Sequence, residues 1–179
     1  MSFKYYEYTV EKEKQYRNDG AEYIISPYAL SWADDNYYVI SYYAKYQGEL
    51  THFRVDRMTD ITVLEEDRES IKAVTGEDDF NIANYSKGIF SMFSGEKEKV
   101  KLEFSNDLIN VAIDRFGEDI PIHKTDDGHF NIMVEVSATQ TFYAWLFQFG
   151  DKVKILSPDN VQGKMREMAE RVCRLYKEN

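Results

Sequence analysis

The feature that most limits how this chain can fold is the stretch at residues 26–58, which contains a turn, two strand patterns and the densest group of Tyr, His and Arg. Residues 37–43 read Tyr-Tyr-Val-Ile-Ser-Tyr-Tyr, and aromatic and β-branched residues of this kind suit a pleated surface. The turn-forming residues 33–36, Ala-Asp-Asp-Asn, stand directly before them. The pattern predicts a strand that takes part in a hairpin.

A second strand is predicted over residues 50–57, where successive side chains should point to opposite faces. Phe53 and Val55 fall on one face. The other face is polar and partly cationic, with His52, Arg54 and Asp56. Alternation places Arg57 on the face of Phe53 and Val55, unless the strand ends or bulges before it.

The other patterns within residues 1–66 indicate further short strands. They occupy residues 3–10, 22–26 and 61–64. Pro27 allows a bend before residues 29–32. About five short strands with tight turns and no long helix predict a small, strongly bent β-barrel of the SH3 or Sm type. We therefore assign residues 1–66 to a first domain with this fold.

Residues 67–97 change character and are interpreted as a connector with a short helix. From residue 98 the pattern predicts the order strand, helix, strand, strand, helix, strand, followed by a terminal helix. We therefore predict a ferredoxin-like βαββαβ(α) domain over residues 98–179 and an α+β class for the whole chain. The terminal helix has a regularly spaced apolar stripe that we expect to be buried: Val161, Met165, Met168, Val172 and Leu175.

The charge of the chain limits its partners. It has 32 acidic and 22 basic side chains, which give a formal net charge of −10 at pH 7. Proteins that gain affinity by neutralising many phosphates usually carry a basic face, so we do not expect generic binding to duplex DNA. Any contact with nucleic acid should occur in a local pocket.

Composition indicates a globular protein of a reducing compartment. Hydrophobic residues make up 43% of the sequence and aromatic residues 15%, which is enough for a packed core. Cys173 is the only cysteine, so no intramolecular disulfide can form. No apolar run approaches the roughly 20 residues that span a bilayer, and residues 1–8 lack the apolar core of a signal peptide. We expect a cytoplasmic protein without membrane contact.

The sequence offers no catalytic set. The three histidines, His52, His123 and His129, lack metal-ligand spacing, and a glycine-rich phosphate loop is missing. Cys173 falls on the side of the apolar stripe, where a free cysteine usually behaves as a small hydrophobic residue. The scattered carboxylates are typical of a solvated acidic surface. We predict that the chain is not an enzyme and holds neither a cofactor nor a metal.

The Tyr, His and Arg group allows two interpretations. Tyr and His can stack on bases and Arg can bind phosphate through two hydrogen bonds, so the group could bind a nucleotide or a short single strand. Its members are Tyr38, His52, Arg54 and Arg57. Alternatively, the tyrosines belong to the core, His52 is an ordinary edge residue and the arginines pair with acidic neighbours. The acidic candidates are Asp56, Asp60 and Glu49.

Two parts of the sequence resemble domains of bacterial transcriptional regulators. Residues 37–39, Tyr-Tyr-Val, are followed by His-Phe-Arg-Val-Asp-Arg-Met at residues 52–58, and this combination resembles the WYL domain. The residues before the tripeptide that add to the resemblance are Pro27, Leu30 and Trp32. Residues 145–150, Trp-Leu-Phe-Gln-Phe-Gly, with residues 153–158 after them, are similar to the C-terminal extension called WCX. Together the two resemblances cover nearly the whole chain.

The resemblance implies a function as well as the same small barrel. WYL domains are implicated in sensing effectors, with nucleotides or single-stranded nucleic acid as the leading candidates. The implied pocket consists of Tyr38, His52, Arg54 and Arg57, with Ser31 and Tyr28 from the preceding segment. Family members usually begin with a helix-turn-helix domain that contacts duplex DNA, and we expect this domain to be absent from the chain.

We therefore expect the ligand-sensing region of a transcriptional regulator, which forms a homodimer. The alternative is a dimerisation or protein-interaction module that binds no small-molecule effector.

Overall fold

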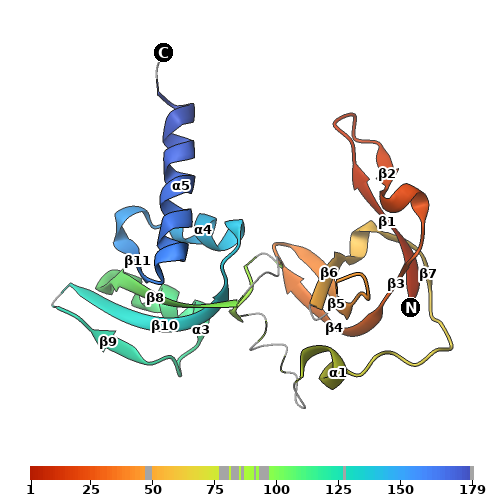
Figure 1. Cartoon of the computed structure of the whole chain (residues 1–179), viewed down its shortest axis with the longest axis horizontal. Helices are drawn as coiled ribbons and strands as arrows, with labels where there is room; N and C mark the ends of the chain where they lie inside the picture. The colour runs from red at the N-terminus through yellow and green to blue at the C-terminus, as the bar shows by residue number, and fades with distance from the viewer. Residues whose placement is uncertain are drawn as a thin grey trace. The chain divides into compact units, whose positions relative to one another are not determined.

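The computed structural model describes residues 1–46, 50–76, 81, 85, 87–90, 92, 97–126 and 128–177. The chain divides into two compact units, Met1–Ile82 and Ala83–Asn179 (Figure 1). Antiparallel sheets occur in both units, and among the described residues α-helices of eight residues or more occur only in the C-terminal unit. This combination confirms the predicted α+β class.

The first sheet of the N-terminal unit is organised around β1 (Ser2–Tyr8). Its partners are all antiparallel: β2 (Lys14–Tyr16), β3 (Tyr23–Ile24) and β7 (Met58–Thr62). The short 3₁₀ helix η1 (Arg17–Gly20) joins β2 to β3. Alternation along β1 buries Phe3 and Tyr5 on the same face, and this face belongs to the core.

The second sheet has the order β4-β5-β6 and contains most of the predicted pocket. Its strands are β4 (Ser26–Ala33), β5 (Asn36–Tyr42) and β6 (Leu50–Arg54), and the 3₁₀ helix η2 (Val55–Arg57) leads from β6 into β7. Asp34 and Asp35 form the turn between β4 and β5 with φ angles of 47° and 59°. Aspartate tolerates this left-handed region, and two such residues give the turn whose twist matches a hairpin.

At Pro27, where the sequence allows a bend, β4 continues as a strand and contains a bulge. The strand runs through Pro27, and its pairing with β5 shifts between Pro27 and Ala29, so that Tyr28 is the extra residue of a bulge. Proline cannot donate a backbone hydrogen bond, and it is therefore tolerated in edge strands and at bulges. β4 provides both conditions, because it lies at the edge of its sheet.

The two sheets of the N-terminal unit pack through a cluster of aromatic rings. The ring of Phe53 in β6 lies 5.1 Å from that of Phe3 and 5.4 Å from that of Tyr5, both in β1. The buried cluster comprises Phe3, Tyr5, Tyr23, Ile25, Val39, Phe53 and Met58. The described strands do not form a closed barrel, and the SH3 or Sm-like assignment stays a prediction. The interlocked rings fix β6 against β1, which positions the residues that follow Phe53.

A strap at residues 68–70 crosses the start of β4. The Arg68 guanidinium donates to the Pro27 carbonyl at 3.0 Å, and the Glu69 N–H donates to the Ser26 hydroxyl at 2.9 Å. Ser70 then caps the short helix α1 (Ile71–Thr75), which ends at Gly76 in the left-handed conformation. The short helix of the connector was predicted further along the chain, as a turn that ends near Gly88, and not at residues 71–75. The helical turn expected within the connector falls largely on residues 80, 82–84 and 86, which lie outside the described part of the chain.

The C-terminal unit contains a sheet of order β11-β8-β10-β9, in which every pair is antiparallel. Along the chain, its strands and long helices are β8 (Lys97–Ser105), α3 (Ile109–Phe116), β9 (Ile122–Lys124), β10 (His129–Ser137), α4 (Gln140–Phe147), β11 (Val153–Ser157) and α5 (Asp159–Leu175). Short 3₁₀ helices, η3 (Asn106–Leu108) and η4 (Gly150–Lys152), precede α3 and β11. This is the element order expected from the sequence. The ferredoxin-like fold itself stays a prediction.

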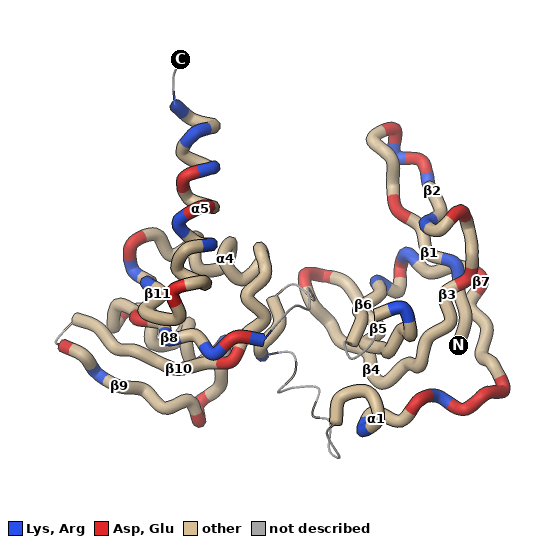
Figure 2. The backbone as a smooth tube through the Cα atoms, viewed as in Figure 1, with Lys and Arg blue, Asp and Glu red and all other residues tan. Residues whose placement is uncertain are grey.

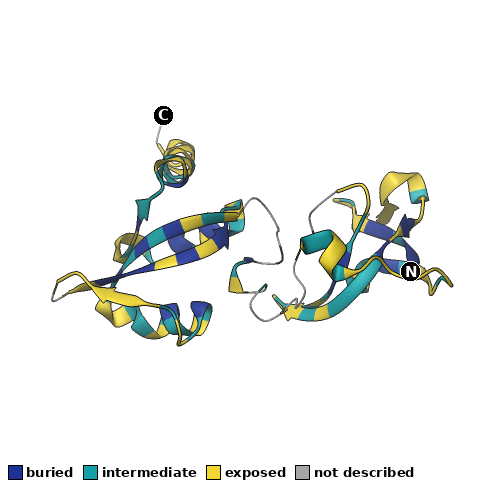
Figure 3. Ribbon diagram, turned by 60° about the horizontal axis from the view of Figure 1, so that its bottom comes forward, coloured by how far each residue is buried: buried dark blue, intermediate teal, exposed yellow. Residues whose placement is uncertain are grey.

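One face of this sheet forms the core of the C-terminal unit. Leu102 in β8 pairs with Ile132 in β10, and both side chains are fully buried. Met133, which follows Ile132 in β10, lies on the opposite face and is exposed. Buried and exposed positions alternate along the strands of this sheet (Figure 3). Against the core, Trp145 of α4 lies among the rings of Phe90, Phe116 and Phe149 at 5.2, 5.7 and 5.1 Å. Apolar residues at every second position of β8 and β10 are therefore buried, while Asn131 and Ser137 of β10 are buried in addition.

The apolar stripe of α5 is only partly buried, which corrects the prediction. Val161 is fully buried and Met165 and Met168 pack on the core, but Val172 is 38% exposed and Leu175 is 80% exposed. Cys173 is exposed as well. The physical reason is length, since α5 continues beyond the sheet that buries its first turns (Figure 1). In the described ranges, no helix is both long enough and apolar enough to cross a bilayer.

Candidate ligand-binding site

Four of the six residues in the predicted pocket share one face of the second sheet. Ser31, Tyr38 and Arg54 lie directly opposite one another in β4, β5 and β6. His52 is two residues before Arg54 in β6 and is paired with Ile40, so it lies on the same face. All four side chains are partly exposed. The sheet therefore brings together a hydroxyl, a phenol, an imidazole and a guanidinium.

Arg57 lies outside the strand alternation, because β6 ends at Arg54 and the chain enters η2. Its side chain is partly buried, and its Nε is buried with no hydrogen-bond partner among the described residues. Burial raises the pKa of the Tyr5 hydroxyl, and the positive charges of Arg57 and Arg54 oppose that shift. Arg54 and Arg57 thus both lie near the Tyr5 hydroxyl, although Arg57 is not part of the strand that contains Arg54.

Tyr28 makes its described contacts with the strap. Its hydroxyl donates to the Glu69 carbonyl at 3.0 Å, and the Arg68 guanidinium lies 5.6 Å from the centre of its ring. Burial raises the pKa of this hydroxyl. Tyr28 therefore ties the strap to β4, and a role in ligand binding stays a prediction for it, as for the other five residues.

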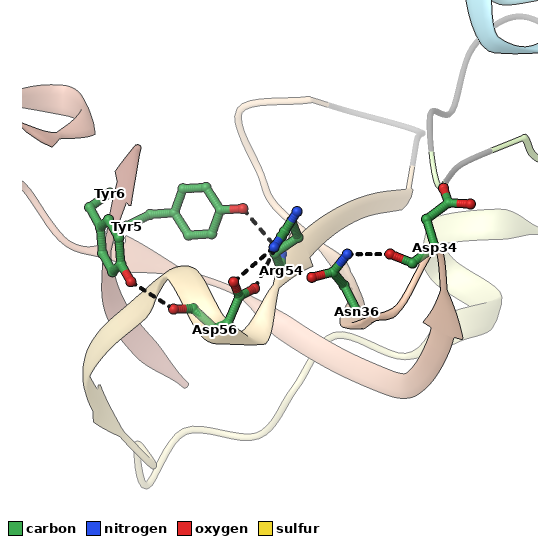
Figure 4. Close-up of polar contacts among 6 residues, drawn as sticks. All are labelled: Tyr5, Tyr6, Asp34, Asn36, Arg54 and Asp56. Carbon is green, nitrogen blue, oxygen red and sulfur yellow. Dashed lines mark hydrogen bonds and ion pairs between the residues drawn. The ribbon is translucent and has the colours of Figure 1, made fainter. Parts of the chain in front are cut away.

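Arg54 is engaged by the carboxylate two residues further along the chain (Figure 4). Its Nε donates to Oδ1 of Asp56 at 3.1 Å and its Nη2 donates to Oδ2 at 2.8 Å. These hydrogen bonds lower the pKa of Asp56 and raise that of Arg54. Of the acidic partners considered from the sequence, Asp60 pairs with Lys4 at 3.1 Å, and Glu49 lies outside the described residues.

Two tyrosines of β1 hold the segment that carries this ion pair. The backbone N–H of Arg54 donates to the Tyr5 hydroxyl at 3.1 Å, and the Tyr6 hydroxyl donates to the Asp56 carbonyl at 2.9 Å. Figure 4 shows both hydroxyls pointing at this segment from the neighbouring sheet. These contacts were not predicted from the sequence. The only available signal was the run of tyrosines at residues 5–8, which alternation explains equally well as core.

Some tyrosines of the N-terminal unit belong to the core and others face the candidate pocket. Tyr5 and Tyr23 are buried in the aromatic cluster, as the structural interpretation expects, whereas Tyr38 is only partly buried. Tyr37 is 57% exposed and its ring lies edge-on to that of Trp32, 4.7 Å away, on the other face of the hairpin. Tyr38 is thus the tyrosine of this hairpin that faces the arginine.

Asn36 is a further polar residue on the predicted face. It lies two residues before Tyr38 in β5, and its side-chain amide donates to the Asp34 carbonyl (Figure 4). From the sequence, Asn36 was predicted only as part of a turn. Its amide stabilises the hairpin at the end nearest Tyr38 and Arg54.

Positive charge at the site is a local feature. Arg17 joins Arg54 and Arg57 among the charges that act on Tyr5. Elsewhere, acidic segments are distributed over both units of this chain of net charge −10 (Figure 2). Within the described residues, no three His, Cys, Asp or Glu side chains gather as a metal site. The arrangement is suited to holding an anionic, planar group by stacking and hydrogen bonding.

Comparison with known families places this site within a defined class of domain. Residues 2–63 match the WYL domain, and all six predicted pocket residues lie in this range. Residues 96–173 match the WCX domain. The chain therefore belongs to the proteins in which a WYL domain is followed by a WCX domain.

The solved structures to which the chain is similar are distant in sequence. One is the proteasome accessory factor B/C (PafBC) of Arthrobacter aurescens, at 19% identity and a TM-score of 0.42, covering 99% of this chain and 25% of that one. Another is a CRISPR Cas-related protein, at 16% identity and a TM-score of 0.45, covering 98% of this chain and 49% of that one. The chain thus spans a quarter to a half of the length of these structures. No curated protein matches it.

Proposed function

We propose that this chain is the ligand-sensing regulatory region of a bacterial transcriptional regulator and is not itself an enzyme. Its effector is a nucleotide or a short single-stranded nucleic acid, bound through the WYL domain. The WYL and WCX matches support the regulatory role. The observation that carries the choice of ligand is the alignment of Ser31, Tyr38 and Arg54 across three strands.

The chemistry of this face suits such a ligand. A phenol and an imidazole can stack on a base, and such stacking contributes about 1–3 kcal/mol per base. A guanidinium can hold a phosphate through two parallel hydrogen bonds. Because a short effector has few phosphates, the site needs only a few cations, which is compatible with the net charge of −10.

In this proposal the bound effector is read by a DNA-binding domain that lies outside these residues. Duplex DNA is contacted only through that domain, and the regulatory region forms a homodimer in the cytoplasm. The finer fold belongs to the same proposal: an SH3 or Sm-like barrel for the WYL domain and a ferredoxin-like domain for WCX. The strand order β11-β8-β10-β9 supports the second of these assignments.

Binding of an end-labelled single-stranded oligothymidylate, followed by fluorescence anisotropy, tests the proposal. Arg54→Ala and Arg57→Ala should each weaken binding by about tenfold or more, because a hydrogen bond to a charged group contributes about 1.5–3 kcal/mol. Arg171→Ala is the matched control, since it removes the same charge from the exposed part of α5. Wild-type affinity in both pocket variants would remove the residue assignment.

The alternative function, a protein-interaction module without effector, is favoured by a different observation. The last turns of α5 expose Val172 and Leu175, and the hairpin exposes Leu30, Trp32 and Tyr37. Light scattering and a nucleotide and oligonucleotide binding screen separate the two functions. A tight dimer that binds none of the ligands favours the interaction module, and saturable binding favours the sensor.

A further inference from the structure

One of the edges through which the Arg54 guanidinium could hold a phosphate is already occupied. Nε and Nη2 of Arg54 form one edge of the planar group, and both donate to the carboxylate of Asp56, at 3.1 and 2.8 Å. Phosphate is bound by arginine through the same kind of paired donation. The carboxylate also neutralises the charge that would attract an anion. A phosphate that takes this edge must therefore displace Asp56.

The ion pair can be displaced without unfolding the site. The side chains of Arg54 and Asp56 are 27% and 56% exposed, and exposed ion pairs contribute little net free energy because water screens them. The displaced carboxylate has solvent available for its hydration. The pair is thus strong enough to orient Arg54 and weak enough to exchange.

The backbone on both sides of the pair is held independently of it. The Tyr5 hydroxyl accepts from the N–H of Arg54, and the Tyr6 hydroxyl donates to the carbonyl of Asp56 (Figure 4). Exchange of partners therefore requires only rotation of two side chains. Rotamer changes of exposed side chains are fast and involve no backbone rearrangement.

From these three observations we infer that Asp56 is an internal competitor, which holds Arg54 until an anionic group of the effector replaces it. This inference rests on the proposed function. It assigns to Asp56 a negative effect on affinity, opposite to that of the arginine beside it. An anion that cannot replace both hydrogen bonds gains little, so the carboxylate selects for ligands with a phosphate-like pair of acceptors.

The test compares two variants with the same change in charge. Asp56→Asn removes the competing charge and keeps the size of the side chain. Asp60→Asn is the control, because Asp60 pairs with Lys4 and asparagine tolerates its φ of 53°. With the labelled oligothymidylate as probe, Asp56→Asn should bind about threefold to tenfold more tightly than wild type. Asp60→Asn should change the affinity by less than about twofold.

A double-mutant cycle identifies the route of the effect. If Asp56 acts through Arg54, the gain from Asp56→Asn disappears when it is combined with Arg54→Ala. Equal affinities of Asp56→Asn and Asp60→Asn, or a gain that persists without Arg54, would overturn the inference and leave the proposed function standing. If neither wild type nor Asp56→Asn binds the oligothymidylate or any ligand of the nucleotide and oligonucleotide screen, while circular dichroism shows both to be folded, the proposed function fails together with the inference.

Discussion

The hydroxyl of Tyr5 accepts a hydrogen bond from the backbone N–H of Arg54 at 3.1 Å, so that a residue of the first strand fixes the last residue of β6. The Tyr5 ring lies in the aromatic cluster, 5.4 Å from the ring of Phe53. The side chain of Tyr5 therefore contributes both to core packing and to the orientation of the candidate site. This relationship makes the site sensitive to a change that removes a single oxygen atom.

Tyr5→Phe should lower the free energy of unfolding by about 0.5–1.5 kcal/mol, because the ring is kept while the N–H of Arg54 loses its acceptor. Urea denaturation followed by circular dichroism measures the change. Tyr23→Phe is the control, since it removes a hydroxyl from the same cluster without involving Arg54. A Tyr5→Phe protein as stable as wild type would mean that water replaces the tyrosine at no cost.

The pKa of Asp56 reports directly on its ion pair. Hydrogen bonds from Arg54 hold it below its ordinary value, and the charge of Arg57 acts in the same direction. Arg54→Ala should therefore raise the pKa of Asp56, so that the carboxyl gains its proton at a higher pH than in wild type. Carbon-detected NMR titration of the Asp56 carboxyl measures this. An unchanged titration curve would show that the pair is not populated in solution.

The alternation along β8 and β10 predicts a large contrast between neighbouring faces. Leu102→Ala should cost about 2–5 kcal/mol, since it removes fully buried atoms and leaves a cavity. Met133→Ala, on the exposed face, should stay within about 0.5 kcal/mol of wild type. Thermal denaturation of both variants provides the measurement. Similar losses in the two would contradict the assignment of the faces.

The α5 stripe gives a comparison within one helix. Val161→Ala should destabilise the protein by about 1–3 kcal/mol, because Val161 is fully buried. Leu175→Ser should change stability by less than about 0.5 kcal/mol, because Leu175 is 80% exposed. Light scattering on the second variant adds a separate result. A fall in molar mass there would identify the end of α5 as a subunit contact.

Local patterns were sufficient to predict the class and much of the element order. Alternating residues located β8 and β10, and the polar face of β6 was read correctly up to Arg54. Alternation works here because a strand that buries one face must place every second side chain there. It states which face a residue occupies and carries no information on which strand lies opposite. The alignment of Ser31 with Tyr38 and Arg54 could therefore be seen only in the structure.

Features that depend on where the core or a strand ends could not be predicted from local patterns. The spacing of Val172 and Leu175 is the same as that of the buried part of α5, so a stripe alone cannot show that the core ends before them. Likewise, alternation could not settle the direction of Arg57, because the 3₁₀ helix that removes it from the strand has no strong sequence signal. The ion pair between Arg54 and Asp56 was one of three open possibilities, and geometry selected it.

The positions of the two tryptophans have an experimental consequence. Trp32 is 58% exposed in the N-terminal unit, whereas Trp145 packs among three phenylalanine rings in the C-terminal unit. Indole emission shifts to longer wavelength in water, so the two residues contribute different bands to the spectrum of the native protein. Loss of the short-wavelength band monitors melting of the WCX domain, and quenching of the long-wavelength band by iodide monitors shielding of the WYL hairpin, with no attached dye.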